Sequence, residues 1–144
     1  SFCQDSSGYM WIATLHGLNR YNGYEFYQYF YDPNDSTSLN NDQVFALYLD
    51  SSHRLWAGTP SGVNRYDFNS NNFIRYGKNS YYGAVQSFFE DHSGNIWAAP
   101  SDGPGLIDKL NQTVVYPYEE HCVVRSLWED NSQRLWMGTN LGLA

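Results

Sequence analysis

The sequence predicts an all-β fold of the β-propeller class, because four copies of one motif follow each other at a propeller-like spacing. In each copy an aspartate is followed six residues later by a tryptophan. These pairs are Asp5 and Trp11, Asp50 and Trp56, Asp91 and Trp97, and Asp130 and Trp136. Successive aspartates are 45, 41 and 39 residues apart, which suits a blade of several short strands. Helical repeats of this length would need an amphipathic 3.6-residue periodicity, which the sequence lacks.

Each copy divides into four predicted strands. Short apolar or aromatic runs at 44–49, 85–90 and 123–129 predict an inner strand buried on both faces. The second strand carries the tryptophan, and a glycine opens the third at Gly17, Gly62, Gly105 and Gly142. Outer strands are predicted at 24–30, 72–76 and 113–118. The blades therefore span about 1–41, 42–82, 83–121 and 122–144, and we expect the last to be truncated and the chain to be a fragment of about three and a half blades.

The turn between the first two strands has its own signature. The tetrads 5–8 and 91–94 read Asp-x-x-Gly, in which the carboxylate accepts nearby backbone N–H groups and the glycine supplies a positive φ. His53 and Gln133 replace that glycine in the other two copies. We expect those two turns to be strained or of another type.

Recurrence of the tryptophan and the aspartate indicates architecture. Each sheet of a propeller must bury one side against the next, and a tryptophan supplies a large apolar area for that contact. Catalytic acids and bases need environments that push their pKa values apart, whereas four carboxylates at equivalent positions share one environment. We therefore assign these residues to blade packing and expect no catalytic residue among them.

Composition limits the partners and the location. Aromatic residues make up 18% of the chain and charged residues 16%, with a net charge of −7 from two lysines, six arginines and fifteen acidic residues. This balance argues against nucleic-acid binding, which needs basic clusters, and it is typical of an extracytoplasmic β protein. We expect no direct membrane insertion by this segment. The four histidines show no ligand spacing, so neither a metal nor a cofactor is expected.

The two cysteines, Cys3 and Cys122, lie at or beside predicted inner strands. Buried free thiols are the favoured interpretation, and a disulfide is the alternative.

A specific family resemblance is carried by residues 5–21 and 50–66. They follow the pattern Asp-x-x-Gly-x-hydrophobic-Trp-x-Gly-Thr-x-x-Gly-Leu-Asn-Arg-Tyr with few departures, and it resembles the two-component regulator propeller repeat. The linker at 31–39 resembles the segment after an early blade in the sensor half of bacterial hybrid two-component histidine kinases. The resemblance implies two seven-bladed propellers and a small β-sandwich domain in the periplasmic part of an inner-membrane protein, followed by a transmembrane helix and a kinase core.

Ligand binding is expected where the copies differ, in the loops between second and third strands and in the connections between blades. Blade three departs most, with Ala99 and Pro100 where Gly-Thr is expected. Aromatic faces beside carboxylates and hydroxyls suit a sugar. The candidate residues are His16, Tyr81, Tyr82, Ser101, Asp102, Glu119, Glu120 and His121.

Two classes of function remain open. The first is a sensor module that binds a carbohydrate, performs no chemistry and relays a change of geometry across the membrane. The second is a propeller enzyme, a polysaccharide lyase or glycosidase, using Asp102 with Glu119 or Glu120. In either case an incomplete ring leaves open edges, so we expect the remaining blades of a longer chain, or a second copy, as a partner.

Overall fold

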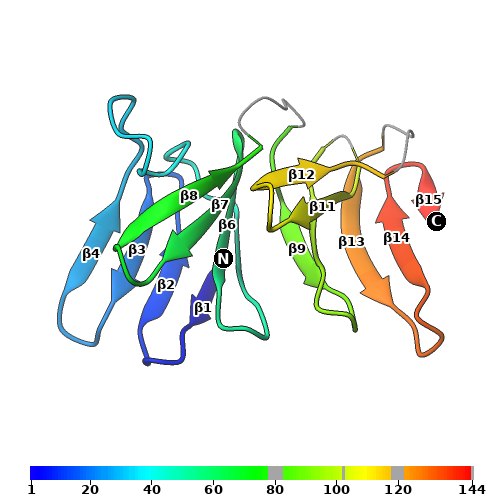
Figure 1. Cartoon of the computed structure of the whole chain (residues 1–144), viewed down its shortest axis with the longest axis horizontal. Coiled ribbons are helices and arrows are strands. Elements are labelled where there is room, and N and C mark those ends of the chain that lie inside the picture. Colours follow the sequence, from blue (N-terminus) through cyan, green and yellow to red (C-terminus); the bar gives the residue numbers. More distant parts are fainter. Residues whose placement is uncertain (78–82, 102, 118–121, 144) are drawn as a thin grey trace.

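The computed structural model describes residues 1–77, 83–101, 103–117 and 122–143, which form four antiparallel sheets in chain order (Figure 1). The all-β propeller prediction is confirmed.

Blade 1 contains β1 (Phe2–Gln4), β2 (Met10–Ala13), β3 (Leu18–Tyr21) and β4 (Phe26–Tyr29). Blade 2 contains β5 (Ala46–Leu49), β6 (Leu55–Thr59), β7 (Gly62–Asp67) and β8 (Asn72–Tyr76). Blade 3 contains β9 (Ser87–Glu90), β10 (Ile96–Ala99), β11 (Gly105–Asp108) and β12 (Thr113–Val115). Blade 4 contains β13 (Val124–Glu129), β14 (Leu135–Thr139) and β15 (Gly142–Leu143).

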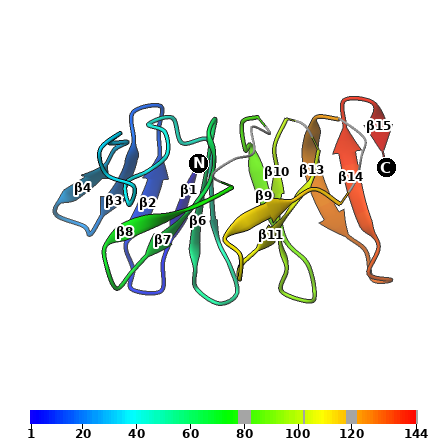
Figure 2. The same ribbon diagram turned by 45° about the horizontal axis from the view of Figure 1, so that its top comes forward.

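The blades follow one another along an arc, with β4 at one end and β15 at the other (Figures 1 and 2). Each strand pairs only with its chain neighbours, so the inner strand of every sheet is an edge strand. No helix long and apolar enough for a membrane crossing occurs among the described residues.

The inner strands of blades 2 and 3 begin two residues later than predicted. Val44 and Val85 precede them, and their N–H groups donate to the carbonyls of Thr14 and Thr59 in the preceding blade, at 2.8 and 3.1 Å. These residues therefore join two blades before the strand enters its own sheet. The inner strands are also half-buried rather than buried on both faces, since each forms a sheet edge with one hydrogen-bonded neighbour.

All four Asp turns adopt the same conformation. The fourth residue donates its N–H to the aspartate carbonyl in each copy, at 2.8 to 3.0 Å. It has φ values of 88° at Gly8, 60° at His53, 76° at Gly94 and 62° at Gln133. Of the two expected alternatives at His53 and Gln133, the strained turn is the one observed: the turn type is unchanged, and its hydrogen bonds hold these residues in the left-handed region despite their side chains.

Apolar cores lie between consecutive blades. Trp11 and Leu18 of blade 1 pack with Leu55, Tyr66 and Phe73 of blade 2. The Trp11 and Tyr66 rings lie 4.6 Å apart between centroids, in an edge-on arrangement. A second core repeats this packing between blades 2 and 3. It contains Trp56, Val63, Tyr76, Val85, Ile96, Ala98, Ile107 and Val114.

Both cysteines are free and half-buried, so the expected full burial was wrong for these edge positions. Burial, together with the nearby Asp5 carboxylate, raises the pKa of the Cys3 thiol to about 11. Cys3 is therefore a neutral thiol at physiological pH, with little nucleophilic character.

Candidate ligand-binding surface at the loop end of the blades

Each blade has two ends with different contents. The Asp turns, between first and second strands, form what we call the turn end. The loops between second and third strands, and the connection from each blade to the next, form the loop end. Figure 1 shows the turns along the lower edge and the connection after β4 along the upper edge.

The structure describes two of the eight predicted ligand residues, His16 and Ser101. His16 is exposed in the β2–β3 loop, where its backbone N–H donates to Thr14 Oγ1 at 3.0 Å. Ser101 is half-buried against the connection into blade 3, so close that a Cβ on Gly83 would lie 2.8 Å from Ser101 Cβ. They belong to different blades. The other six predictions lie outside the described residues, namely Tyr81, Tyr82, Asp102, Glu119, Glu120 and His121.

Exposed aromatic residues lie beside the β2–β3 loop that carries His16, and none of them was among the predicted ligand residues. We call Leu15, His16, Phe30 and Tyr31 the loop platform; all four side chains are exposed. Phe30 and Tyr31 follow β4 directly, where the predicted outer strand was too long by one residue. The signal that could have revealed them is an aromatic run that continues past the end of the strand.

Short backbone contacts hold the loop platform together. The Gly17 N–H donates to the Asp42 carbonyl at 2.6 Å, and the Tyr31 N–H donates to Asp42 Oδ1 at 2.7 Å. Gly17 has a φ of 88°, and a Cβ there would lie 2.5 Å from the Tyr29 carbonyl oxygen and 3.0 Å from the Phe30 ring. Only glycine fits this approach. The β2–β3 loop is thereby fixed against the connection that follows β4.

Arg75 fixes the same connection from blade 2. Its guanidinium donates to the carbonyl oxygens of Asp35, Ser38 and Leu39 at 2.9 to 3.0 Å, and it lies 5.6 Å from the centre of the Tyr31 ring. A cation beside an aromatic face stabilises the ring's position. The loop platform therefore presents ordered rings, whose faces can pack against the C–H groups of a sugar while nearby polar groups pair with hydroxyls.

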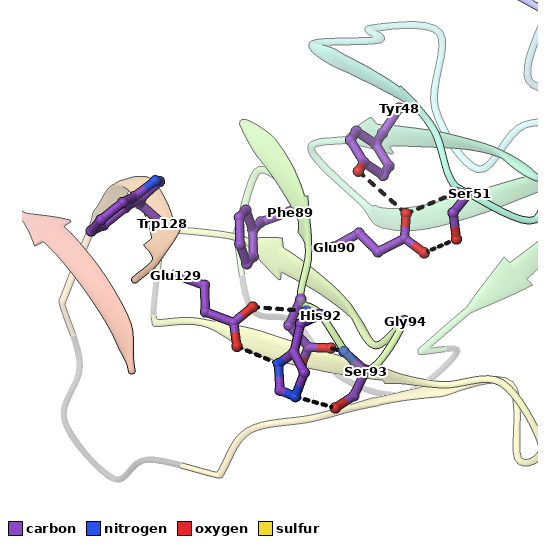
Figure 3. A pocket seen from close by; sticks show the side chains of 10 residues that line it. Tyr48, Ser51, Phe89, Glu90, His92, Ser93, Gly94, Trp128 and Glu129 are labelled. Carbon is purple, nitrogen blue, oxygen red and sulfur yellow. Dashed lines mark hydrogen bonds and ion pairs between the residues drawn. The ribbon is translucent and has the colours of Figure 1, made fainter. Parts of the chain in front are cut away.

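At the turn end, a hollow of about 640 Å³ lies between blades 2, 3 and 4 (Figure 3). Glu90 accepts hydrogen bonds from the Ser51 N–H at 2.8 Å and from Ser51 Oγ at 2.5 Å. Glu129 in turn accepts from the His92 N–H at 2.7 Å and pairs with His92 Nδ1 at 2.5 Å.

These two contacts form one repeated device, which we call the glutamate latch. A glutamate just before the Asp turn of one blade holds the residue just after the aspartate of the preceding blade. Two of the carboxylates that line the hollow, Glu90 and Glu129, therefore join neighbouring blades, and the third, Asp91, accepts hydrogen bonds within its own blade. Sequence reasoning missed this device, although the Glu-Asp pairs at 90–91 and 129–130 were its visible signal.

The repeated aspartate and tryptophan are hydrogen-bonded to each other in every blade. The indole Nε1–H donates to the carboxylate Oδ2 of the aspartate six residues earlier, at 2.8 to 3.0 Å. Burial of Asp50 opposes its ionisation, but hydrogen bonds from Trp56 and Arg54 outweigh it and lower its pKa. Asp91 is lowered in the same way by Trp97 and Asn95. These carboxylates are ionised structural acceptors.

Four consecutive blades with one shared turn chemistry define a β-propeller repeat segment. Residues 38–61 match the Two component regulator propeller family, which confirms the resemblance inferred from the sequence. The match covers β5, the following Asp turn, β6 and the connection that enters blade 2. The comparison with curated proteins finds no match.

Solved structures share the architecture over nearly the whole chain. The extracellular domain of a hybrid two component system from B. thetaiotaomicron is 25% identical, with a TM-score of 0.80 over 99% of this chain and 21% of that chain. The extracellular domain of a one component system from the same organism is 22% identical, with a TM-score of 0.75 over 98% of this chain and 22% of that chain. The chain thus spans about a fifth of the length of these structures.

Virginiamycin B lyase from Staphylococcus aureus also shares the fold, at 14% identity and a TM-score of 0.70 over 99% of this chain and 53% of that chain. This likeness concerns the fold alone, because one propeller architecture supports unrelated functions.

Proposed function

We propose that the chain is a non-catalytic sensor segment from the extracytoplasmic region of a bacterial two-component sensor. The observation that carries this is the similarity, at 25% identity over 99% of the chain, to the extracellular domain of a hybrid two component system. The family match at residues 38–61 supports the same assignment. On this proposal the parent protein is a membrane-anchored histidine kinase, and the segment lies in the periplasm.

The arrangement of polar groups supports binding rather than chemistry. The repeated aspartates accept indole and backbone N–H groups, and the latch glutamates join blades. The enzyme alternative depends on Asp102, Glu119 and Glu120, which lie outside the described residues. The lyase likeness adds no support, because it concerns the fold alone.

We assign the ligand to the carbohydrate class and its binding site to the loop platform. The exposed Phe30 and Tyr31 rings offer apolar faces next to the β2–β3 loop, which carries the exposed His16, and the contacts of Asp42 and Arg75 hold Tyr31 in place. A sugar pairs apolar C–H faces with hydroxyl groups, and this surface offers a counterpart for each. Relay across the membrane then requires that the sugar bind one receptor arrangement more tightly than another, since equal affinity shifts no population.

Calorimetric titration of the chain with neutral and acidic mono- and oligosaccharides tests the proposal, with chromatography of each mixture for new products. We expect binding to at least one sugar without turnover. Product release would overturn the non-catalytic assignment, and no heat of binding across the panel would overturn the carbohydrate assignment.

A matched pair of variants tests the location of the site. Tyr31→Ala removes one ring of the loop platform and should weaken sugar binding by up to about tenfold, the scale of one aromatic contact. Tyr24→Ala removes an exposed tyrosine from the β3–β4 turn at the opposite end and should leave the affinity unchanged. Equal effects of the two variants would contradict a site at the loop platform.

A further inference from the structure

An arginine and a tyrosine recur at equivalent places in two successive blade interfaces. By strand register, Arg20 and Arg65 correspond, since each lies opposite the tryptophan of its own blade. Tyr29 and Tyr76 correspond in the same way, on the outer strands. Tyr29 packs against the core between blades 1 and 2, and Tyr76 lies in the core between blades 2 and 3. The two interfaces can therefore be compared residue by residue.

Between blades 1 and 2, both groups have partners. Arg20 Nη1 donates to the Tyr66 hydroxyl at 3.1 Å, and the Arg20 guanidinium lies 4.8 Å from the centre of the Tyr9 ring. The hydroxyls of Tyr66 and Tyr29 both donate to Asn71 Oδ1, the second at 2.8 Å. The arginine and the tyrosine of this interface thus belong to one hydrogen-bonded network.

Between blades 2 and 3, the residues that complete this network are replaced. Ile107 takes the place of Tyr66, by its register with the outer strand of its blade. Gln112 takes the place of Asn71, and both have a positive φ, of 51° and 55°. The Gln112 side chain is exposed and makes no hydrogen bond to the described residues. The hydroxyl and the carboxamide oxygen that serve the first interface therefore have no counterpart in the second.

Arg65 and Tyr76 are consequently unpaired. Arg65 makes no hydrogen bond, ion pair or cation–π contact with the described part of the chain, and its Nε is buried. Tyr76 is only 2% exposed, and its hydroxyl has no hydrogen-bond partner within the same residues. Burial raises the pKa of the Tyr76 hydroxyl, and the nearby Arg65 charge opposes that rise, so the two groups are neighbours. Buried donors without an acceptor are costly and need a functional or structural explanation.

The charges around this pair favour an anion. Arg54 also lies near the Tyr76 hydroxyl. The two carboxylates close by, Asp50 and Asp108, already accept hydrogen bonds from Arg54 and from the β11–β12 turn, respectively. The Arg65 charge therefore has no carboxylate of its own. Arg54 and Arg65 are both partly exposed, so a solute can approach them from water.

We propose that an oxyanion group, a carboxylate, sulfate or phosphate, binds between blades 2 and 3 by accepting hydrogen bonds from the Arg65 guanidinium and the Tyr76 O–H. A guanidinium presents its N–H donors in one plane and pairs with two oxygens of such a group. The oxyanion oxygens then serve as the acceptors that Tyr66 and Asn71 supply in the preceding interface. This oxyanion site is separate from the loop platform and does not depend on the sugar site proposed there.

A nuclear magnetic resonance titration of the unaltered chain tests the oxyanion site, because the buried Nε–H groups of Arg65 and Arg20 each give a side-chain signal. Sulfate, phosphate, acetate and glucuronate are each compared with chloride at equal ionic strength. We expect a saturable shift of the Arg65 signal alone. No saturable shift with any of the four, or equal shifts at both arginines, would overturn the proposal. A tighter response to glucuronate than to the other three would identify a sugar acid as the source of the oxyanion, and any other order would identify a free ion.

Tyr76→Phe removes only the hydroxyl and should weaken binding of the tightest of these four anions by about tenfold, the scale of one hydrogen bond to a charged group. Its stability in urea should be unchanged, because the hydroxyl has no partner among the described residues. Tyr29→Phe is the matched control. It should lower the stability, since its hydroxyl bonds to Asn71, and leave the anion affinity unchanged. Unaltered affinity in Tyr76→Phe would overturn the oxyanion site.

A pair of arginine variants separates the site from general charge effects. Arg65→Gln should abolish the saturable binding, whereas Arg20→Gln makes the same charge change at the equivalent place and should retain it. Equal losses in both would overturn the proposal, and Tyr76→Phe decides the question if Arg65→Gln does not fold. Tyr31→Ala, which tests the sugar site, should leave the anion affinity unchanged, so the two proposals can fail separately.

Discussion

Trp56 and Trp136 occupy the same place in the repeat, but their surroundings differ. Each donates its indole N–H to the aspartate six residues earlier, at 2.9 and 3.0 Å. Trp56 is 0% exposed because blade 3 covers it, whereas Trp136 in blade 4 is half-buried. Trp11 resembles Trp56 in being covered, and Trp97 resembles Trp136 in being half-buried. The hydrogen bond is therefore a property of the blade, while burial is a property of its neighbour.

The largest expected difference lies between alanine substitutions of these two tryptophans. Trp56→Ala should lower the free energy of unfolding by about 3 to 5 kcal/mol, the cost of a large cavity in a packed core. Trp136→Ala should cost clearly less, because water already reaches that side chain. Urea unfolding measures both losses. Similar losses would show that the cover by blade 3 adds little to the stability that Trp56 contributes.

The partner aspartates should show a smaller version of the same contrast. Asp50→Ala leaves the buried Trp56 indole N–H and the Arg54 backbone N–H without their acceptor, at a cost of about 2 to 4 kcal/mol. Asp130→Ala removes the equivalent hydrogen bonds in blade 4, which are more exposed, so water can replace them. Its loss in urea unfolding should be smaller. A loss at Asp130 that equals or exceeds the loss at Asp50 would contradict a role for burial.

The depressed carboxylate pKa values make stability depend on pH in the acid range. The pKa values of Asp50 and Asp91 are lowered in the folded chain relative to an unfolded value of about 3.9. Their contribution is therefore complete above about pH 5 and is lost as the pH falls through their folded values. Below about pH 4, the melting temperature should fall with decreasing pH, and it should fall less steeply in the Asp50→Asn variant. An unchanged slope in that variant would assign the acid loss to other groups.

The glutamate latch allows a comparison with a blade that lacks it. Blade 2 has Leu49 at the latch position, whereas blade 3 has Glu90. Glu90→Leu copies blade 2 and should cost about 1 kcal/mol in urea unfolding, because the Ser51 bonds are partly exposed. Glu25→Gln, at the exposed β3–β4 turn, is the control and should be neutral. No loss in Glu90→Leu would show that the latch does not stabilise the contact between blades.

The smallest effect is expected at the turns. His53 has a φ of 60°, in the position that Gly8 and Gly94 occupy in other blades. His53→Gly should raise the free energy of unfolding by about 0.5 kcal/mol, because relief of the strained φ is partly offset by unfolded-chain entropy. The reverse change, Gly94→Ala, should cost about 1 kcal/mol. Thermal unfolding of both variants checks the sign, and a destabilised His53→Gly would show that the histidine side chain contributes there.

Much of the fold could be predicted from local patterns in the sequence. The Asp turn, the tryptophan strand and the glycine before the third strand are local features, and their period of about 40 residues indicates blades. Strand ends were less predictable. Val44 and Val85 look like strand residues, yet they hydrogen-bond to the preceding blade, which no local pattern can reveal.

The candidate site was less accessible from sequence. The differences between copies pointed to His16, but Phe30 fell inside the predicted outer strand 24–30 and neither it nor Tyr31 was predicted to bind a ligand. Their exposure depends on where β4 ends and on how Asp42 and Arg75 hold the connection. Both are contacts between distant parts of the chain.

The sequence by itself determined the propeller class and the equivalence of its four aspartates and four tryptophans, since repeated short-range patterns need no partner to be recognised. Only the tertiary structure decided which tryptophans are buried and that glutamates join the blades. The physical reason is that burial belongs to a pair of surfaces. A blade encodes one side of each interface, and its neighbour in space supplies the other.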